Sequence, residues 1–274
     1  MNDALTLPSH ASRQRATPCD APNSAMTSCP ANAVTSRARA DGFGAQYTHV
    51  TSNFVMARRQ GLPYCTNPWL HLEHKANASR LWAFIGGSSF GPPATTATAL
   101  AEQHAALAWR ARPTDEAARR DVRRFYDGAP KDMAILQPPF AAGLNVAVHV
   151  RRGDIKRQLN PRFTSNGLIA RCAAAVVGRL GRGAHVHIFS EGRDKTEFGP
   201  LAQVAPPDRL HWHLNAPIEA TFHSLVMADA LIIAHSSFSD AAAYLRPAND
   251  TIWAPTGVKP QLAWMYRHLR IDAC

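Results

Sequence analysis

The stretch Leu144-Asn-Val-Ala-Val-His-Val150, followed at once by Arg151-Arg-Gly-Asp154, decides the fold of the second half of this chain. A short, nearly continuous apolar run of this kind predicts a buried strand. Beyond it, apolar runs of similar length alternate with segments in which apolar residues recur at helical spacing. That alternation predicts βαβ units, and therefore a parallel sheet with helices on its faces.

Further elements follow this first strand in regular order. We expect strands over Val186–Phe189, Arg209–Leu214, Leu231–Ala234 and Thr251–Ala254. We expect helices over 168–180, 218–226, 238–245 and 261–268. Strands and helices of these lengths predict that residues 141–274 form a Rossmann-like domain.

Residues 41–140 are less regular. The glycine-bearing turn Asp41-Gly-Phe-Gly-Ala-Gln46 opens a predicted helix that Gly61 ends, and a short strand over 62–66 follows it. Two more helices are expected, one around 79–85 and one that starts near Pro113 and stops at Gly128. The arginines at 119, 120, 123 and 124 give the latter helix a basic surface.

The first forty residues are rich in Ser, Ala, Thr, Pro and Arg, and they contain neither an apolar period nor an apolar run of signal-peptide length. We predict that residues 1–40 are a disordered leader, with an organellar transit segment as a second interpretation. Residues 31–40 lack an apolar strand before the glycine turn, so the first domain is expected to be small or incomplete.

Composition narrows the class of protein and of partner. The chain has 274 residues, of which 46% are hydrophobic and 18% charged, as in a globular protein. Its formal charge of +10 calls for an anionic partner, which could be nucleic acid, a membrane surface or a phosphorylated small molecule. Its apolar runs are far shorter than the ~20 residues of a membrane-spanning helix, so no span is predicted.

The cysteines and histidines predict no metal centre. Five cysteines, at positions 19, 29, 65, 172 and 274, are odd in number, widely spaced and never in a Cys-x-x-Cys pair. This spacing predicts neither a disulfide scaffold nor a zinc ribbon. Histidine pairs stand at 185/187, 211/213 and 71/74, but none has the third ligand and carboxylate of a zinc enzyme, so structural roles are expected.

Ligands bind open parallel sheets at the carboxyl ends of the strands, where helix N-termini and loop amides converge. Two predicted loops at that edge carry unusual residues, namely His149, Arg151, Arg152 and Asp154 in one, and Ser236, Ser237 and Ser239 in the other. A guanidinium can hold two phosphate oxygens, and a helix start with hydroxyl groups attracts anions. Together the two loops predict a diphosphate site.

Each feature also has a plainer interpretation. Serines before a helix are ordinary caps, a histidine on an apolar strand is a core residue, and Arg152-Gly153-Asp154 is also an adhesion tripeptide. Their position on one edge of one sheet favours the binding site. The sequence has no Walker loop, no Gly-x-Gly-x-x-Gly after a strand, no Gly-x-Ser-x-Gly elbow and no Asp-x-Asp pair. Arginine rather than a metal ion is therefore expected to neutralise the diphosphate.

His149-Val-Arg-Arg-Gly-Asp154 resembles the first motif of the α1,2-, α1,6- and protein-O-fucosyltransferase superfamily, a strand that ends in His-x-Arg-Arg-x-Asp. His187-Ile-Phe-Ser-Glu191 resembles the second motif, an apolar strand that ends beside an acid. His235-Ser-Ser-Phe-Ser-Asp240 and the helix that follows it resemble the third. Gly42-Phe-Gly-Ala-Gln46 is similar to the N-terminal glycine-rich turn of these enzymes, and the motifs stand in family order over residues 41–255.

The resemblance implies a GT-B-like α/β architecture of two Rossmann-like domains with parallel sheets, an acceptor-side domain over 41–140 and a nucleotide-sugar-binding domain over 141–274. It implies inverting, metal-independent transfer of fucose from GDP-fucose to a hydroxyl of a glycan or glycoprotein. Arg152 would stabilise the departing diphosphate, and Asp154 is the candidate general base. Donor contacts are expected from His149, Arg151, Arg152, Glu191, Ser236, Ser237, Phe238 and Ser239, with Gly42, Gly44 and Gln46 in the glycine turn.

Departures from the family pattern keep other functions open. The lysine and glutamate that α1,6 enzymes carry soon after the first motif are Ile155 and Leu159 here, and a tryptophan pair after the third is Asp240-Ala241. The alternatives are a catalytically inactive sugar-nucleotide or glycan-binding protein of the same fold, or a basic nucleic-acid-binding protein that uses residues 119–124. The resemblance implies the Golgi or endoplasmic reticulum lumen, although no signal or anchor is recognised in this chain, and the oligomeric state stays open.

Overall fold

A computed structural model describes the chain over residues 28–36, 41–73, 76–94, 115–132, 136, 140, 142–155, 160–181, 183–247, 250–258 and 269–274. The predicted helix over 261–268 lies outside the described residues, as do His74, Leu159 and Cys19. No helix in the described part of the chain is long and apolar enough to cross a membrane.

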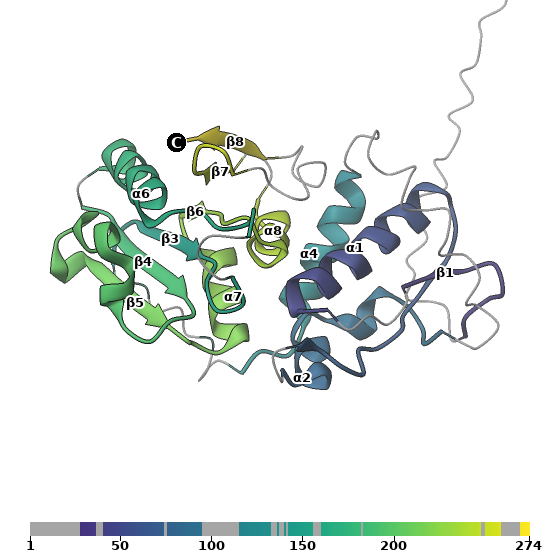
Figure 1. Ribbon diagram of the computed structural model, residues 1–274. Helices are drawn as coiled ribbons and strands as arrows, with labels where there is room; N and C mark the ends of the chain where they lie inside the picture. The colour runs from purple at the N-terminus through teal and green to yellow at the C-terminus, as the bar shows by residue number, and fades with distance from the viewer. Residues whose placement is uncertain are drawn as a thin grey trace, which may run out of the picture.

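A six-stranded parallel sheet organises the second half of the chain (Figure 1). Its strands are β3 (Asn145–Val150), β4 (His185–Ser190), β5 (Leu210–Leu214), β6 (Ala230–Ile232), β7 (Thr251–Ala254) and β8 (Arg270–Ala273). They lie in the order β5-β4-β3-β6-β7-β8, so the chain starts in the middle, moves outward to one edge, returns, and moves to the other. If β3 is counted as the first strand of this sheet, the order is 3-2-1-4-5-6, which is that of a Rossmann fold. The predicted parallel α/β sheet is confirmed, and β8 is a strand that the sequence did not predict.

Helices cover both faces of this sheet. They are α6 (Asn166–Leu180), α7 (Ile218–Met227) and α8 (Ser237–Tyr244), with the 3-10 segments η6 (Lys195–Gln203) and η7 (Pro207–Arg209). Alternate residues of β3 point to opposite faces: Val146 and Val148 join the core under α6, while Ala147 joins the core under α7 and α8. The sheet is therefore buried on both sides, which explains why its central strands read as continuous apolar runs.

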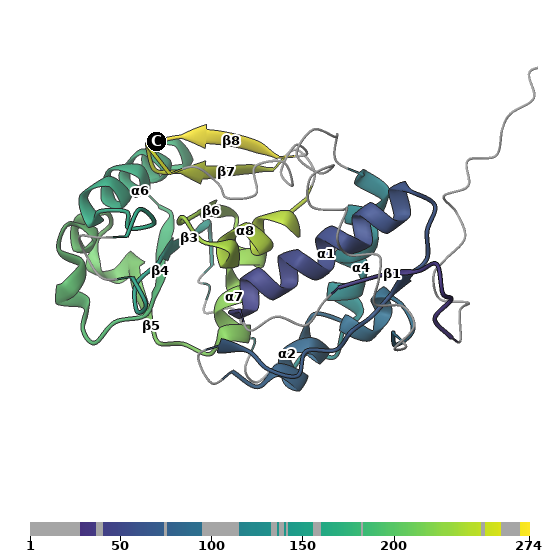
Figure 2. The same cartoon turned by 45° about the vertical axis from the view of Figure 1, so that its right-hand side comes forward.

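The N-terminal part packs against the α8 side of the sheet (Figure 2). It contains β1 (Val34–Thr35), α1 (Phe43–Arg59), β2 (Tyr64–Cys65), α2 (Ala78–Phe84), η3 (Gly87–Phe90) and α4 (Glu116–Gly128). β1 and β2 form a two-stranded parallel sheet. Phe43, Tyr47 and Phe54 of α1 belong to the same hydrophobic core as Phe222 and Tyr244 of α7 and α8. The two parts thus share one core, and the GT-B arrangement stays a prediction.

The leader prediction is wrong for part of its range. Within residues 28–36, Ala33, Val34, Thr35 and Ser36 are buried, and the Ser36 hydroxyl lies 2.6 Å from that of Tyr64. The apolar strand that residues 31–40 were expected to lack is β1, which is only two residues long. A two-residue strand carries too little alternation to be recognised in a sequence, and its partner β2 lies 30 residues further along the chain.

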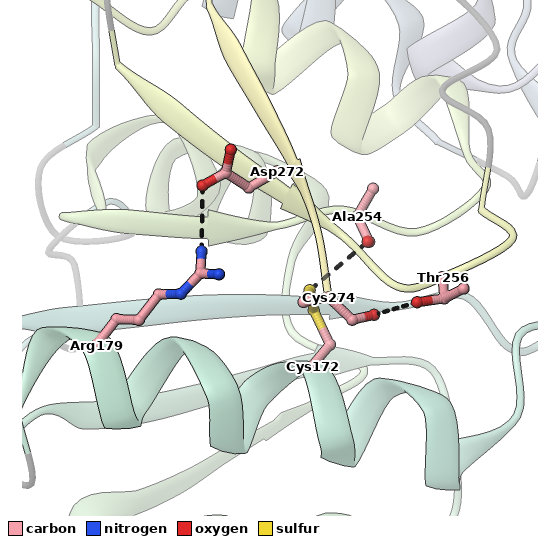
Figure 3. The surroundings of a disulfide bond; sticks show 6 residues. All are labelled: Cys172, Arg179, Ala254, Thr256, Asp272 and Cys274. Carbon is pink, nitrogen blue, oxygen red and sulfur yellow. Dashed lines mark hydrogen bonds and ion pairs between the residues drawn. A yellow bond between two sulfur atoms is a disulfide. The ribbon is translucent and has the colours of Figure 1, made fainter.

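The prediction that the cysteines form no disulfide scaffold is also wrong, because four of the five cysteines form disulfides. Cys29 pairs with Cys65 and so ties the chain before β1 to β2. Cys172 of α6 pairs with Cys274, the residue after β8, as Figure 3 shows. The partners are 36 and 102 residues apart. Spacing along the chain does not reveal such pairs, since the fold alone brings them together.

Candidate anion-binding site at the sheet switch point

A cavity of about 270 Å³ lies at the carboxyl edge of the sheet, where the strand order reverses between β3 and β6. Open α/β sheets bind ligands at this switch point. The predicted residues that line the cavity are Gly42, Gly44, His149, Arg151, Arg152, Asp154, Glu191, Ser236, Ser237 and Phe238. Segments far apart in the sequence therefore meet here: the glycine turn, the loop after β3, the loop after β4 and the start of α8.

Arg151 connects the two predicted phosphate-binding loops. Its Nη2 donates to Asp154 Oδ2 over 2.8 Å, and its Nη1 donates to the backbone carbonyl oxygen of His235 over 3.4 Å. The loop after β3 and the loop after β6 are thus in direct contact. The Asp154 carboxylate pairs with Arg151, and this ion pair favours the plainer interpretation of Asp154 from the sequence, in which it orients an arginine of the same loop.

Arg152 is held more tightly than Arg151. Its guanidinium donates to the carbonyl oxygens of Arg151 and Thr164 over 2.7 and 3.0 Å, and it also donates to Asn166 Oδ1. The same group stacks over Phe163, with its central carbon 4.5 Å from the ring centroid. A guanidinium fixed in this way loses little conformational entropy when it binds an anion, so it is preorganised.

His149 lines the cavity from the carboxyl end of β3. Its Nδ1 is buried and has no hydrogen-bond partner in the described part of the chain. Burial, with smaller contributions from the charges of Arg151 and Arg152, lowers the pKa of His149 to about 3. The imidazole is therefore neutral near pH 7. Its Nδ1 can form a hydrogen bond with a ligand without adding a charge to the site.

The serines at the start of α8 do not all face the cavity. Ser236 caps the helix, because its Oγ accepts from the amide of Phe238 over 3.3 Å. Ser239 is fully buried, and its hydroxyl bonds to the backbone of Ala234 and Ser236. The prediction that Ser239 contacts the diphosphate is thus wrong, because its side chain points into the helix–strand junction. Ser236 and Ser237 line the cavity together with the helix N-terminus.

The glycine turn lies directly against α8. A Cβ on Gly44 would be 2.4 Å from the backbone nitrogen of Phe238, which is closer than real Cβ atoms approach. The N-terminus of α1 therefore meets that of α8, and both helix dipoles present positive ends to the cavity. Gln46 was predicted as part of the glycine turn at the site, but it does not line the cavity. Its side chain lies in the core, where it is only 1% exposed.

Sequence reasoning missed several lining residues. Arg162 adds a third guanidinium, Asp41 and Glu73 add carboxylates from the N-terminal part, and Thr221 adds a hydroxyl from α7. Asp41 stands next to the predicted glycine turn, so its position carried a signal. Glu73 and Thr221 lie in no motif. The backbone amide of Glu73 donates to the carbonyl oxygen of Asp41 over 3.3 Å, and α7 carries Thr221 to the cavity.

The histidines of β4 and β5 form one array instead of two separate pairs. The rings stack in the order His185, His211, His187, His213 and Phe189, with successive centroids 5.3, 4.5, 5.3 and 4.6 Å apart. No group of three or more His, Cys, Asp or Glu side chains in the described residues could hold a metal ion. The structural role that the sequence favoured for these histidines stays a prediction.

Hydrogen bonds determine which ring nitrogens of this histidine array carry a proton. The Asn145 amide donates to Gly143, so its Oδ1 is left to accept from Nε2 of His187 over 3.0 Å. Nδ1 of His187 must then accept from Nε2 of His213, 3.1 Å away. Burial and the neighbouring imidazoles lower the pKa of His187 to about 3 and that of His213 to about 4.

No protein-family model matches this chain, and no curated protein is similar enough to count as a relative. Its function therefore has to be inferred from the motifs and from the geometry of this cavity.

Proposed function

We propose that this protein transfers fucose from GDP-fucose to a hydroxyl of a glycan or glycoprotein, with inversion at the transferred carbon and without a metal ion. The observation that carries the proposal is the meeting of the arginine loop after β3 and the start of α8 in one cavity at the switch point. The identity of the donor comes from the resemblance of the motifs to fucosyltransferases.

The cavity contains groups that can bind a diphosphate. Arg151, Arg152 and Arg162 contribute three guanidinium groups, and the N-termini of α1 and α8 add partial positive charge. The lining also has four carboxylates, those of Asp41, Glu73, Asp154 and Glu191. A nucleotide diphosphate that leaves a sugar gains negative charge, which other transferases neutralise with a divalent ion. Here arginine would supply that stabilisation, because a guanidinium binds two phosphate oxygens at once.

The reaction assigns distinct roles to the arginines. The acceptor oxygen attacks C1 of fucose, the bond from C1 to the β-phosphate oxygen breaks, and GDP leaves with the electron pair. Arg152, which the loop holds rigidly, would stabilise the charge that develops on the β-phosphate. Arg151, paired with Asp154, would position the diphosphate between the two loops.

The nucleic-acid alternative loses support from α4. Arg119 is 5% exposed and donates to the carbonyl oxygen of Arg246, while Arg123 donates to that of Leu245 over 2.7 Å. These two arginines cap the C-terminal end of α8, so they are part of the fold. Arg124 forms an ion pair with Asp121 on the same helix. The helix therefore does not present four unengaged arginines to a phosphate backbone.

GDP binding and GDP release test the proposal. We expect calorimetry to show that GDP binds at the cavity, and we expect GDP release from GDP-fucose in the presence of EDTA when neutral glycans are supplied as acceptors. A strict need for a divalent ion would contradict the proposal. GDP binding without transfer to any of a broad range of acceptors would favour the catalytically inactive binding protein instead.

A further inference from the structure

A second, larger cavity adjoins the first. It has a volume of about 430 Å³ and is lined by Gly153, Phe163, Arg193 and Glu197. Arg152 and Glu191 line both cavities, so these two side chains form the boundary between them. The second cavity lies within the size range of small-ligand sites.

The two cavities differ in the charged groups that line them. The first has three guanidinium groups, four carboxylates and two helix N-termini, whereas the second has two arginines and two glutamates together with the half-buried ring of Phe163. Balanced charges give no net attraction for an anion. Carboxylates accept hydrogen bonds and guanidinium groups donate them, so this lining fits an uncharged ligand that carries many hydroxyl groups.

The carboxylates around the cavities are not equivalent. Asp154 pairs with Arg151, and Glu197 accepts from the backbone amide of Arg193 over 3.0 Å. Asp41 and Glu73 each have an interaction within the chain. The Glu191 carboxylate forms no hydrogen bond or ion pair with the described residues, although it stands at the boundary. It is thus the described lining carboxylate best able to accept a proton.

Backbone geometry holds Glu191 in this position. Asn215, at φ 54°, accepts from the amide of Gly192 over 3.2 Å and donates to its carbonyl oxygen over 2.5 Å. This pair of bonds fixes the residue directly after Glu191. Gly153, at φ +76°, leaves the space that the carboxylate occupies, since a Cβ there would lie 1.6 Å from Glu191 Oε2. A side chain at Gly153 in the first motif would therefore clash with Glu191 in the second.

We propose that Glu191 is the general base of the transfer and that the second cavity holds the acceptor, an uncharged carbohydrate. This inference rests on the function proposed above and replaces Asp154 in the role of the base. The hydroxyl proton of the acceptor passes to the carboxylate of Glu191 as the acceptor oxygen forms its bond to C1. The electron pair of the broken bond between C1 and oxygen leaves with GDP, whose charge Arg152 stabilises.

Glu191→Gln tests the inference because it removes the base and keeps the size of the side chain. Turnover of GDP-fucose is measured with the neutral oligosaccharide that the unchanged chain uses best, or with water as the acceptor where none is used. We expect turnover to fall by about 10²–10⁴-fold. We expect GDP affinity to stay within about threefold, because the arginines and helix N-termini proposed to hold the diphosphate are unchanged. The acid limb of the pH profile, which is the fall of kcat/KM at low pH as the general base becomes protonated, should disappear.

Three further variants make the result specific. Asp154→Asn should weaken GDP binding, because Arg151 loses the carboxylate that orients it, but it should keep the acid limb. Glu191→Asp should retain part of the turnover and the acid limb. Asp208→Asn, which removes an exposed carboxylate that is paired only loosely at 3.7 Å, should match the unchanged chain in every measurement.

The outcomes separate this inference from the proposed function. If the unchanged chain neither binds GDP nor releases it from GDP-fucose, both fail. If it does so and Glu191→Gln keeps its turnover within threefold, or loses the acid limb only when Asp154 is replaced, Glu191 is not the base and the proposed function stands.

Discussion

Arg151 donates from Nη1 to the backbone carbonyl oxygen of His235, which lies 84 residues further along the chain. This contact joins the loop after β3 to the loop after β6 across the switch point of the sheet. It places the arginines of the first motif beside the helix start of the third. The diphosphate hypothesis required these loops to be neighbours, and a wide separation between them would have contradicted it.

Arg152→Lys should lower turnover of GDP-fucose by about 10²–10³-fold. Lysine keeps the charge but cannot donate to Thr164 and Asn166 together while it stacks on Phe163. The measurement is GDP release, with circular dichroism to verify the fold. Arg171→Lys, at an exposed position on α6, is the matched control and should leave turnover unchanged. Equal turnover by both variants would exclude Arg152 from the reaction.

Gly44→Ala should disturb the contact of α1 with α8. The added methyl group would lie 2.4 Å from backbone atoms that cannot move independently, so we expect a loss of at least about 1–3 kcal/mol in the free energy of unfolding. GDP affinity should fall as well, because the two helix N-termini separate. Denaturant unfolding and calorimetry measure the two effects.

Gly178→Ala is the control for that substitution. Gly178 lies inside α6 with no atom within 4 Å of the position that an added methyl group would take, and alanine is the better helix former. We expect the free energy of unfolding to rise by about 0.5–1 kcal/mol. If Gly44→Ala were equally harmless, the close approach of the two helices would be incorrect.

The protein should lose stability in acid. His149, His187 and His213 have folded-state pKa values of about 3, 3 and 4, below the ordinary 6.5 of an unfolded chain. Folding thus favours the neutral forms, so this stability is complete above about pH 6.5 and declines as the pH falls toward 3. We expect the free energy of unfolding to drop by at least about 1 kcal/mol between pH 7 and pH 5.

His213→Gln provides the test of the origin of that loss. Glutamine can still donate to Nδ1 of His187 but does not titrate, so the decline between pH 7 and pH 5 should be smaller than in the unchanged chain. His71→Gln, at an exposed position, should show the full decline. An identical pH dependence for all three chains would mean that the array of β4 and β5 does not govern acid stability.

Reduction of the disulfide between Cys172 and Cys274 should loosen β8, the edge strand. A cross-link that closes a loop of this size, with its partners 102 residues apart, contributes about 2–5 kcal/mol. Cys274→Ser should therefore unfold at lower denaturant concentration than the unchanged oxidised chain. Addition of dithiothreitol should lower the stability of the unchanged chain but affect the variant less, since only Cys29–Cys65 remains. Equal midpoints in oxidising buffer would contradict this contribution.

Much of the fold could be predicted because its signals are local. The runs around β3, β4 and β6 are apolar because both faces of the sheet are covered, and the helices between them show a helical period. Strands that alternate with helices become parallel, and parallel strands bring all their carboxyl ends to one edge. His149, Arg151 and Ser236 could thus be placed in one site from their positions after predicted strands.

Other features depended on contacts between distant residues. β1 is only two residues long and β8 is mostly exposed, so neither carries a clear apolar pattern. Both are recognised only by their pairing with β2 and β7. The disulfide partners, the arginines of α4 that cap α8, and the direction of Ser239 are equally invisible in the sequence. Local periodicity says nothing about which side chain fills which space.

The sequence by itself determined that strands alternate with helices and that an arginine loop and a serine-bearing helix start follow two of those strands. Only the tertiary structure decided that Arg151 reaches His235, that Asp154 is held in an ion pair, and that Glu191 lies over Gly153 between two cavities. The reason is physical: backbone conformation follows from neighbours along the chain, whereas the partners of a charged side chain follow from packing between segments that are far apart in it.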